Sequence, residues 1–197
     1  MDDPIKIRKQ KIRREYLILR DSIPEDKLIK KSKIIADHFL MSPEYLNCEN
    51  LFIYRSMGSE VITDFIIEAA LAAGKNVALP VMTDKKKREM VFIKIISLDN
   101  LKTNSFGVSE PEYDETNIVT GDPRVLIAAP GVAFSKDGSR AGYGGGYYDR
   151  YLSLNKYSRC VGLCFEAQLA EHIPSDSSDV KMDALVTENG VVRIRPV

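Results

Sequence analysis

VLIAAPGVAFSKDGSRAGYGGGYYDRYL, residues 125–152, is the stretch of sequence that decides the fold. Its first part, VLIAAP, is a continuous apolar run, which is typical of a central strand covered on both faces. A turn follows at Asp137-Gly138, then a glycine-rich loop, and then YYDRYL, which has the character of a helix. A buried strand that leads through a glycine-rich loop into a helix predicts an α/β protein.

Short apolar runs elsewhere in the chain predict the other strands. They lie at residues 51–56, 76–80, 90–96, 159–165, 183–188 and 191–195. A helical segment over about residues 62–73, closed by Gly74, joins the first two runs, so these should form a parallel pair with a right-handed crossover. We therefore expect one domain, residues 1–197, in which helices flank a mostly parallel sheet with an antiparallel strand at its edge.

The chain begins with an expected amphipathic helix over residues 5–20. A rotation of about 100° per residue collects its apolar side chains into one stripe. That stripe consists of Ile5, Ile12, Tyr16 and Leu19. Lys9, Arg13 and Arg20 fall along one flank of the stripe, so we expect them to point partly inward.

A second helix should follow and end near Leu40. Ser22 followed by Glu25 fits a capping box, in which the serine side chain and the glutamate side chain bond each other's backbone N–H groups. Its expected buried residues are Leu28, Ile35 and Phe39.

The composition excludes several classes of protein. Of 197 residues, 44% are hydrophobic and 28% are charged, which excludes a collagen, a coiled coil, a disordered tail and a disulfide-stapled miniprotein. Because 28 Lys and Arg balance 28 Asp and Glu, no overall field attracts nucleic acid or an anionic membrane. The sequence contains neither a secretory signal nor a membrane-spanning apolar stretch of ~20 residues, so we expect a cytoplasmic protein.

Cysteine and histidine are too few for several kinds of site. Cys48, Cys160 and Cys164 fit neither a CxxC pair nor a zinc pattern, so we expect them to be reduced and mostly buried. His38 and His172 are the two histidines of the chain, which argues against an HExxH zinc site and a Ser-His-Asp triad.

The glycine-rich loop is a candidate phosphate cradle. Glycines let backbone N–H groups approach an anion closely, and the start of a helix adds a partial positive charge. The flanking residues supply cations (Arg140 and Arg150), an oxygen ligand for Mg²⁺ (Asp149) and aromatic faces (Tyr143, Tyr147 and Tyr148). The other interpretation is a tightly turned connector that binds no ligand.

Known nucleotide fingerprints do not match this loop. After Gly142 and Gly144, GxGxxG requires a third glycine at position 147, which is Tyr147. A Walker loop needs GKS or GKT, which is absent from the sequence. The loop therefore favours neither a generic dinucleotide dehydrogenase nor a P-loop NTPase.

The segment GSRAGYGGGYYDRYL closely resembles the signature of bacterial-type 5-formyltetrahydrofolate cyclo-ligases, also called 5,10-methenyltetrahydrofolate synthetases. Further similar motifs follow in order along the chain: KQKIR, YRSMGSEVIT, FGVSEP, PGVAF, FEAQL and SDVKMDALVTE. Two positions depart from the family pattern. Ala141 stands where leucine is usual, which suggests a packing change, and Ser178 stands where histidine is common.

The resemblance implies a ligase of one-carbon metabolism that uses ATP and Mg²⁺. It would convert 5-formyltetrahydrofolate, which can carry a polyglutamate tail, to 5,10-methenyltetrahydrofolate, ADP and phosphate. The implied fold is a Rossmann-like three-layer α/β architecture similar to that of NagB/RpiA/CoA-transferase-like proteins. The implied protein is a monomer that binds these small molecules and neither nucleic acid nor a membrane.

The resemblance also implies site residues. Those for ATP are Lys9, Arg13, Arg140, Gly142, Gly144, Gly145, Gly146 and Tyr148. Those for the folate are Arg55, Met57, Glu60, Tyr143, Gly144, Gly145, Gly146 and Tyr147. Asp149 and Asp179 would bind the metal, and Arg140, Tyr147 and Asp149 would be catalytic.

Each of these residues also has an ordinary structural interpretation. The N-terminal cations could form a solvated helix face, and the tyrosines could pack in an aromatic cluster. Asp149 could compensate the helix dipole, and we expect Arg140 to be exposed on its loop. The DKKKRE run at residues 84–89 reads as a solvated hairpin, and a second interpretation is that it attracts a polyglutamate tail.

Three alternative functions stay open at this point. The first 33 residues contain eleven Lys and Arg against six Asp and Glu, so a nucleic-acid-binding module is the non-enzymatic alternative. A diverged enzyme of the same fold could bind a phosphate ligand without folate. A non-catalytic folate store could retain the pocket. Storage needs neither a metal nor groups for phosphoryl transfer, however, so the presence of Arg140, Asp149 and Asp179 argues against it.

Overall fold

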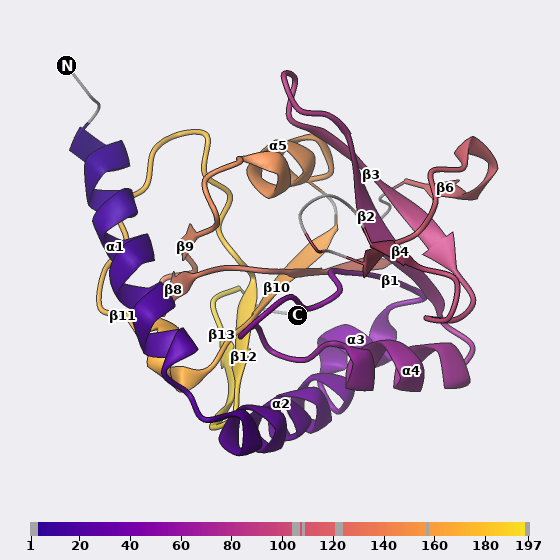
Figure 1. Cartoon of the computed structure of the whole chain (residues 1–197), viewed down its shortest axis with the longest axis horizontal. Coiled ribbons are helices and arrows are strands. Elements are labelled where there is room, and N and C mark those ends of the chain that lie inside the picture. The colour runs from indigo at the N-terminus through magenta and orange to yellow at the C-terminus, as the bar shows by residue number, and fades with distance from the viewer. Residues whose placement is uncertain (1–3, 104–106, 108, 121–123, 157, 196–197) are drawn as a thin grey trace.

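The computed structural model describes every residue except 1–3, 104–106, 108, 121–123, 157 and 196–197. Among the described residues, eight strands form a central sheet in the order β13-β12-β10-β7-β1-β2-β3-β6 (Figure 1). The strands are β1 (Asn50–Ile53), β2 (Asn76–Asp84), β3 (Glu89–Ile95), β6 (Ile118–Val119), β7 (Val125–Ala129), β10 (Arg159–Leu163), β12 (Ala184–Thr187) and β13 (Gly190–Arg193). Two residues of the FGVSEP motif, Phe106 and Val108, lie outside the described part of the chain.

The middle of this sheet is parallel and its outer strands are antiparallel. β7 pairs in parallel with both β1 and β10, and all five of its residues are buried, as the continuous apolar run predicted. β1 and β2 form the expected parallel pair through α4 (Asp64–Ala72), which ends before Gly74 at φ +74°. β3, β6 and β13 pair antiparallel with their neighbours, so the predicted mostly parallel sheet with antiparallel edges is confirmed.

Helices cover both faces of the sheet (Figure 1). α2 (Glu25–Leu40), α3 (Pro43–Asn47) and α4 pack on one face, where Ile35, Phe39 and Ile66 are fully buried. α5 (Tyr147–Leu154) packs on the other face, where Leu152 joins a second apolar cluster with Phe92. Two hydrophobic layers, one on each face, confirm the three-layer α/β arrangement.

α1 (Pro4–Asp21) packs on a small three-stranded sheet beside the main one. This small sheet contains β8 (Ala133–Ser135), β9 (Arg140–Ala141) and β11 (Leu169–Ala170). Ile12 and Tyr16 of α1 contact a buried cluster that includes Ala133 and Ala141. Because β9 leads directly into the glycine-rich loop, this packing places α1 beside that loop.

Short elements complete the described structure. β4 (Lys102–Thr103) pairs with β5 (Ser109–Glu110), and two 3₁₀ turns are η1 (Glu115–Asn117) and η2 (Glu166–Gln168). All three cysteines are free and buried, as expected. Within the described residues, no helix combines the length and the apolar character that crossing a membrane requires.

Two local predictions about the N-terminal helices are wrong. Leu19 is 43% exposed, because it lies about 80° around α1 from Lys9, at the edge of the inward face. The Ser22 capping box is absent, because Pro24 is the N-cap of α2 and the Ser22 hydroxyl donates to the Leu19 carbonyl at 2.7 Å.

Candidate active site

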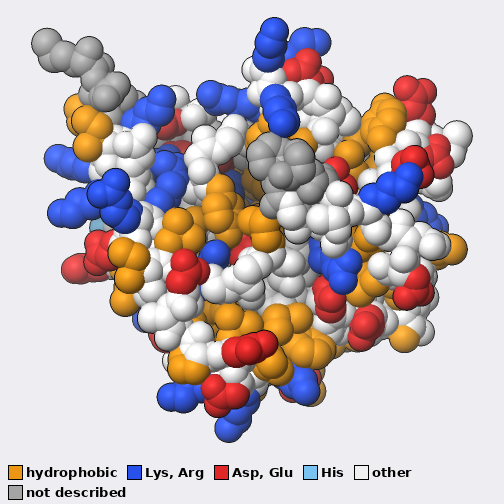
Figure 2. Space-filling view, in the orientation of Figure 1, with side chains coloured by type: hydrophobic (Ala, Val, Ile, Leu, Met, Phe, Trp, Pro, Cys, Tyr) orange, Lys and Arg blue, Asp and Glu red, His pale blue; other side chains and the backbone are white. Residues whose placement is uncertain are grey.

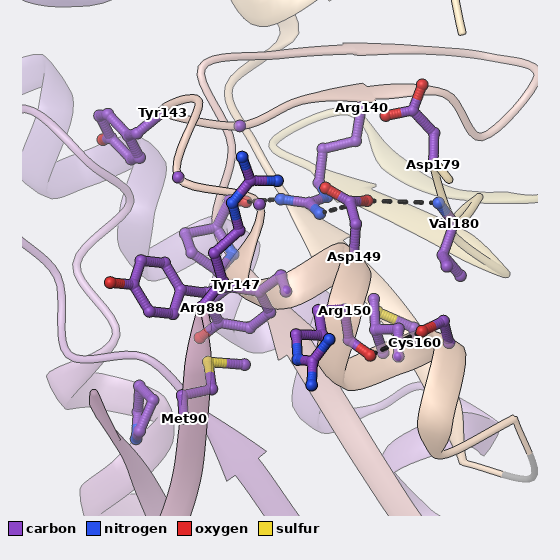
Figure 3. A pocket seen from close by; sticks show the side chains of 18 of the residues that line it. Arg88, Met90, Arg140, Tyr143, Tyr147, Asp149, Arg150, Cys160, Asp179 and Val180 are labelled. Atoms are coloured by element: carbon purple, nitrogen blue, oxygen red, sulfur yellow. Dashed lines mark hydrogen bonds and ion pairs between the residues drawn. The ribbon is translucent and has the colours of Figure 1, made fainter. Parts of the chain in front are cut away.

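A cavity of about 1260 Å³ lies where the carboxyl ends of β1, β2 and β7 meet α1, the glycine-rich loop and α5 (Figure 3). A pocket for one drug-sized ligand is about 300–1,000 Å³, so this cavity has room for two ligands. Every residue that the sequence analysis assigned to the site lines it: Lys9, Arg13, Arg55, Met57, Glu60, Arg140, Gly142, Tyr143, Gly144, Gly145, Gly146, Tyr147, Tyr148, Asp149 and Asp179. The individual roles of these residues stay predictions.

α1 contributes three cations from one face. Lys9, Arg13 and Arg20 lie within about 40° of one another around the helix. Lys9 and Arg20 are buried, although each is a charged residue on a terminal helix. Lys9 forms an ion pair with Asp179, and Arg13 Nε donates to the Gly142 carbonyl at 2.6 Å. The expected inward orientation of this flank is therefore confirmed.

The glycine-rich loop needs glycine for its own geometry. Gly144 and Gly146 have φ of +97° and +73°, a region that other L-residues rarely adopt. A Cβ atom on Gly145 would lie 2.9 Å from the ring of Tyr147, and one on Gly142 would lie 2.8 Å from Arg140 Nη1. The loop is thus tightly turned, as the connector interpretation requires, but it is also surrounded by cations, which that interpretation does not explain.

Arg140 is buried, which corrects the expectation of an exposed loop residue. It belongs to strand β9 and pairs with Phe134 of β8, so its side chain starts inside the structure. Nη2 donates to Asp149 Oδ1 at 3.0 Å, and Nη1 donates to the Pro130 carbonyl at 3.1 Å (Figure 3). Its Nε is buried without a partner among the described residues. A buried guanidinium with an unused N–H is costly unless a ligand accepts from it.

The fold brings Asp149 and Asp179 into one region, although thirty residues separate them. Asp149 Oδ1 accepts from the backbone N–H of Val180 at 3.2 Å, so the loop before β12 lies over the first turn of α5. Asp179 pairs with Lys9 and also accepts from the backbone N–H of Asp176 at 2.7 Å. Both carboxylates therefore line the same cavity, and their role as shared metal ligands stays a prediction.

The pair Asp149 and Asp179 resembles a magnesium site completed by substrate phosphates more than a metal site built from protein ligands alone. No cluster of three or more His, Cys, Asp or Glu side chains could hold a metal in the part of the chain that the structure describes. Mg²⁺ is usually bound by one or two carboxylates together with water and substrate phosphates. Asp149 and Asp179 therefore fit a magnesium ion that arrives with a nucleotide.

The charged groups around the glycine-rich loop form one half of the cavity, and several of them shift the pKa of Arg13. Burial lowers the pKa of Arg13, Asp179 and Asp149 raise it, and Arg140 lowers it again. Lys9, Arg13, Arg88 and Arg140 outnumber the two carboxylates, Asp149 and Asp179, and two of these cations are already paired with them. A phosphate group that entered would therefore have to compete with these ion pairs.

The other half of the cavity contains a buried carboxylate. Glu60 is 5% exposed; its Oε1 accepts from the Tyr143 hydroxyl at 2.5 Å and its Oε2 from the Met57 backbone N–H at 2.8 Å. Burial raises the pKa of Glu60, and these two hydrogen bonds together with Arg20 lower it. Each oxygen keeps a further lone pair, so the carboxylate can accept from two N–H groups of a ligand.

The remaining predicted residues form the walls. Arg55 forms an ion pair with Asp64 at 3.2 Å, so part of its binding capacity is already used. Tyr147 lies next to the glycines, whereas Tyr148 packs its ring edge-on against Phe92 with 6.4 Å between centroids. The Tyr148 hydroxyl is buried without a partner among the described residues, and burial raises its pKa.

Two cations, Arg88 at the cavity and Arg20 behind Tyr143, were not among the site residues that the sequence analysis named. The DKKKRE run does form the turn between β2 and β3, but Arg88 at its end reaches the glycine-rich loop and would lie 3.3 Å from a Cβ on Gly146. Figure 2 shows Lys and Arg side chains gathered over this hairpin, at the top of the view. The second cation is Arg20, which donates to Ser59 and Tyr143. Only the run of basic residues could have pointed to Arg88 before the structure was known.

Comparison with known proteins shows the family to which the chain belongs. The sequence matches the 5-formyltetrahydrofolate cyclo-ligase family over residues 5–188. The chain belongs to this family. Every candidate site residue, from Lys9 to Asp179, lies inside the matched segment.

Individual cyclo-ligases resemble the chain over most of their length. The 5-formyltetrahydrofolate cyclo-ligase of Haemophilus influenzae is 31% identical over 182 residues, which cover 91% of this chain and 97% of that protein. A probable cyclo-ligase of Schizosaccharomyces pombe is 36% identical over 187 residues, 81% of this chain and 90% of that protein. The solved 5,10-methenyltetrahydrofolate synthetase of Aquifex aeolicus superposes with a TM-score of 0.83 at 30% identity, covering 96% of this chain and 94% of its own.

The two departures from the cyclo-ligase pattern have local explanations. Ala141 is fully buried in the small sheet, where its cluster contacts Ile12 and Tyr16 of α1, so it belongs to the packing of α1. The backbone N–H of Ser178 donates to Asp176 at 2.8 Å, so Ser178 helps to shape the loop that presents Asp179.

Proposed function

We propose that this cavity performs the family reaction, the ATP-dependent conversion of 5-formyltetrahydrofolate to 5,10-methenyltetrahydrofolate with release of ADP and phosphate. The observation that supports it most is the composition of the cavity. One half gathers glycines, cations and two carboxylates suited to a nucleotide and its metal, and the other half holds a buried carboxylate suited to a pterin. The two halves meet at the glycine-rich loop.

The chemistry explains why both halves are needed. A formyl oxygen is a poor leaving group, so N10 of the folate cannot expel it directly. If the formyl oxygen first attacks the γ-phosphate, the P–O bond to ADP breaks and a phosphorylated imidate forms. N10 then attacks the formyl carbon and loses its proton, and the C–O bond breaks to release phosphate. Such a phosphoryl transfer depends mainly on positioning and charge compensation.

Arg140, Lys9 and Arg13 are the cations that we assign to the nucleotide. The buried, unused Nε of Arg140 is available to an anion, and its guanidinium can stabilise charge that develops on the transferred group. The backbone N–H groups from Gly142 to Gly146 would contact the phosphates. Tyr148 would contribute its unpaired hydroxyl to the same half.

Asp149 and Asp179 are the residues that would hold Mg²⁺. When bound, this ion supplies charge neutralisation for the β- and γ-phosphates. In the structure, Asp179 pairs with Lys9 and Asp149 pairs with Arg140. We infer that these pairs exchange partners on binding, so that the carboxylates face the metal and the cations face the phosphates.

Glu60 is the residue that we assign to the pterin. Its two oxygens are held by Tyr143 and by the Met57 backbone, which leaves acceptor capacity for pterin N–H groups. Tyr147 would line the ring and lie close to the reacting formyl group, and Met57 and Arg55 would contact the folate from the end of β1. The remaining expectations, a cytoplasmic monomer and a substrate with a polyglutamate tail, stay predictions.

One observation weighs against the nucleic-acid alternative. Lys9 and Arg13 line the cavity, and Lys9 and Arg20 are buried, so α1 does not present these three cations to the backbone of a duplex. A phosphate-binding surface for nucleic acid must present its cations to solvent.

The test is to mix the protein with 5-formyltetrahydrofolate and MgATP and to follow the methenyl chromophore in the near ultraviolet. We expect a signal that requires all three components and a release of one phosphate per product formed. ATP hydrolysis that ignores the folate would favour the diverged phosphate-ligand enzyme, and folate binding without any turnover would favour the folate store. Either result from folded protein would overturn the proposed function.

A further inference from the structure

Arg20 is a buried cation in the last turn of α1. A basic residue at this position usually lies at the surface, where it compensates the helix dipole. Arg20 is only 4% exposed and directs its N–H groups into the cavity wall. Nε donates to Ser59 Oγ at 2.9 Å and Nη1 donates to the Tyr143 hydroxyl at 2.9 Å. Its Cζ also lies 5.8 Å from the centroid of the Tyr143 ring.

These contacts continue directly to the carboxylate in the pterin half. The Tyr143 oxygen accepts from Arg20, and its O–H donates to Glu60 Oε1 at 2.5 Å. Tyr143 is 46% exposed, so packing alone does not fix its ring. Arg20 therefore sets the position of the Tyr143 hydroxyl, and that hydroxyl sets one oxygen of Glu60.

The charge of Arg20 also acts on Glu60. Burial raises the pKa of this carboxyl, whereas Tyr143, the Met57 backbone N–H and Arg20 lower it. The other titratable groups that interact with Glu60 are Tyr54 from the end of β1 and Tyr148 from α5, and burial raises the pKa of both phenols. They are neutral near pH 7, so Arg20 is the cation that acts on this carboxyl. It lowers the pKa of Glu60 in addition to the two larger effects of the Tyr143 and Met57 hydrogen bonds.

We propose that Arg20 is a positioning residue for folate recognition, acting through Tyr143 to hold Glu60 as an oriented carboxylate. It makes no contact with the reacting atoms, and this role rests on the proposed function of Glu60. The inference links the far end of α1 to the pterin half, whereas Lys9 and Arg13 serve the nucleotide half.

The test compares Arg20→Met with Arg20→Lys, Tyr143→Phe and a control, Arg14→Met, in which an exposed cation of the same helix is removed. Loss of a hydrogen bond to a charged group typically weakens binding by about tenfold or more. We expect Arg20→Met to raise the KM for 5-formyltetrahydrofolate by that factor, with the KM for ATP within about twofold of wild type. Arg14→Met should change neither. Arg20→Lys keeps the charge but cannot bond both partners, so it should fall between wild type and Arg20→Met.

Two further readouts separate positioning from a merely structural role. Without Arg20, Glu60 should accept a proton at higher pH, so the acid limb of the pH profile of kcat/KM for folate should move upward. In a Tyr143→Phe background, Arg20→Met should add little to the folate KM, because the bridging hydroxyl is already gone. A structural role would raise both KM values and leave the pH profile in place.

The outcomes are distinct from those that test the function itself. Absence of turnover in wild type overturns the proposed function, whereas an active wild type with unchanged folate KM and pH profile in the Arg20 variants overturns the role of Arg20. If Arg20→Met does not fold, Arg20→Lys and Tyr143→Phe decide. Wild-type folate KM values in both would contradict the proposal.

Discussion

The two halves of the cavity are built on different principles. In the nucleotide half, the charged groups pair with one another: Lys9 with Asp179 and Arg140 with Asp149. In the pterin half, Glu60 is held on both oxygens by protein groups, the Tyr143 hydroxyl and the Met57 backbone N–H. On our proposal the first half exchanges ion-pair partners on binding, whereas the second keeps the hydrogen bonds that already orient Glu60. Substitutions in the two halves should therefore give different kinetic defects.

The largest effect is expected in the nucleotide half, from Arg140→Met. Removal of a preorganised donor to developing charge should lower kcat by about 10²–10³-fold. Because Arg140 is buried and bonds Asp149, the variant should also lose about 1–3 kcal/mol of unfolding free energy. Steady-state kinetics and thermal melting measure the two losses. Arg124→Met is the control, since its pair with Glu49 is exposed. A folded Arg140→Met enzyme with near wild-type kcat would contradict this role.

Asp149→Asn and Asp179→Asn test the metal ligands of the same half. Each should raise the Mg²⁺ concentration for half-maximal activity by at least about tenfold, the lower end of what even outer-shell changes cost. Folate binding measured without nucleotide should not change. Asp26→Asn, an exposed carboxylate of α2, serves as the control. If both site variants keep the wild-type Mg²⁺ requirement, the shared-metal assignment is wrong.

Folate binding through Glu60 should depend on pH in the acid range, which distinguishes the pterin half from the nucleotide half. Burial raises the pKa of Glu60 above its ordinary value of 4.5, so it takes up a proton at higher pH than a free carboxyl. Since a protonated Glu60 accepts poorly, affinity for 5-formyltetrahydrofolate should fall as pH is lowered toward that pKa. Glu60→Gln should remove this dependence and weaken folate binding by about tenfold, leaving ATP affinity in place. Each ligand is titrated alone. A defect in ATP binding only would contradict the assignment of Glu60 to the folate and assign it to the nucleotide instead.

Local pattern was sufficient for seven of the eight strands that the structure describes in the central sheet, but not for β6, the strand order or the small sheet. The all-apolar run of β7 and the helix between β1 and β2 could be interpreted from neighbouring residues alone. The glycine positions of the loop were also visible, although their φ values were not.

The burial and the partners of the site's charged residues could not be predicted, because they depend on contacts between residues far apart in the sequence. Lys9 meets Asp179 across 170 positions, and Arg20 meets Tyr143 across 123, so their burial depends on how α1 packs on the small sheet. Arg140 looked exposed because glycines follow it, yet it belongs to a strand. Leu19 looked buried because an apolar stripe was assumed, whereas the inward face of α1 is partly cationic.

The smallest effect is expected where the two halves meet, from Gly145→Ala. This glycine does not have positive φ, but an added Cβ would lie 2.9 Å from the Tyr147 ring, which must move. The cost of an off-rotamer side chain corresponds to about a threefold to tenfold rise in KM for ATP. Gly146→Ala adds backbone strain of about 1–2 kcal/mol and should be worse in thermal melting. An equal effect of both substitutions on stability would contradict this distinction.

The most direct test of the account follows one oxygen atom. If the two halves bring the formyl oxygen onto the γ-phosphate, that oxygen must leave in the released phosphate. With 5-formyltetrahydrofolate labelled by ¹⁸O in the formyl group, mass spectrometry should find one labelled oxygen in each phosphate formed with the methenyl product. Unlabelled phosphate, with the label in water, would contradict the account.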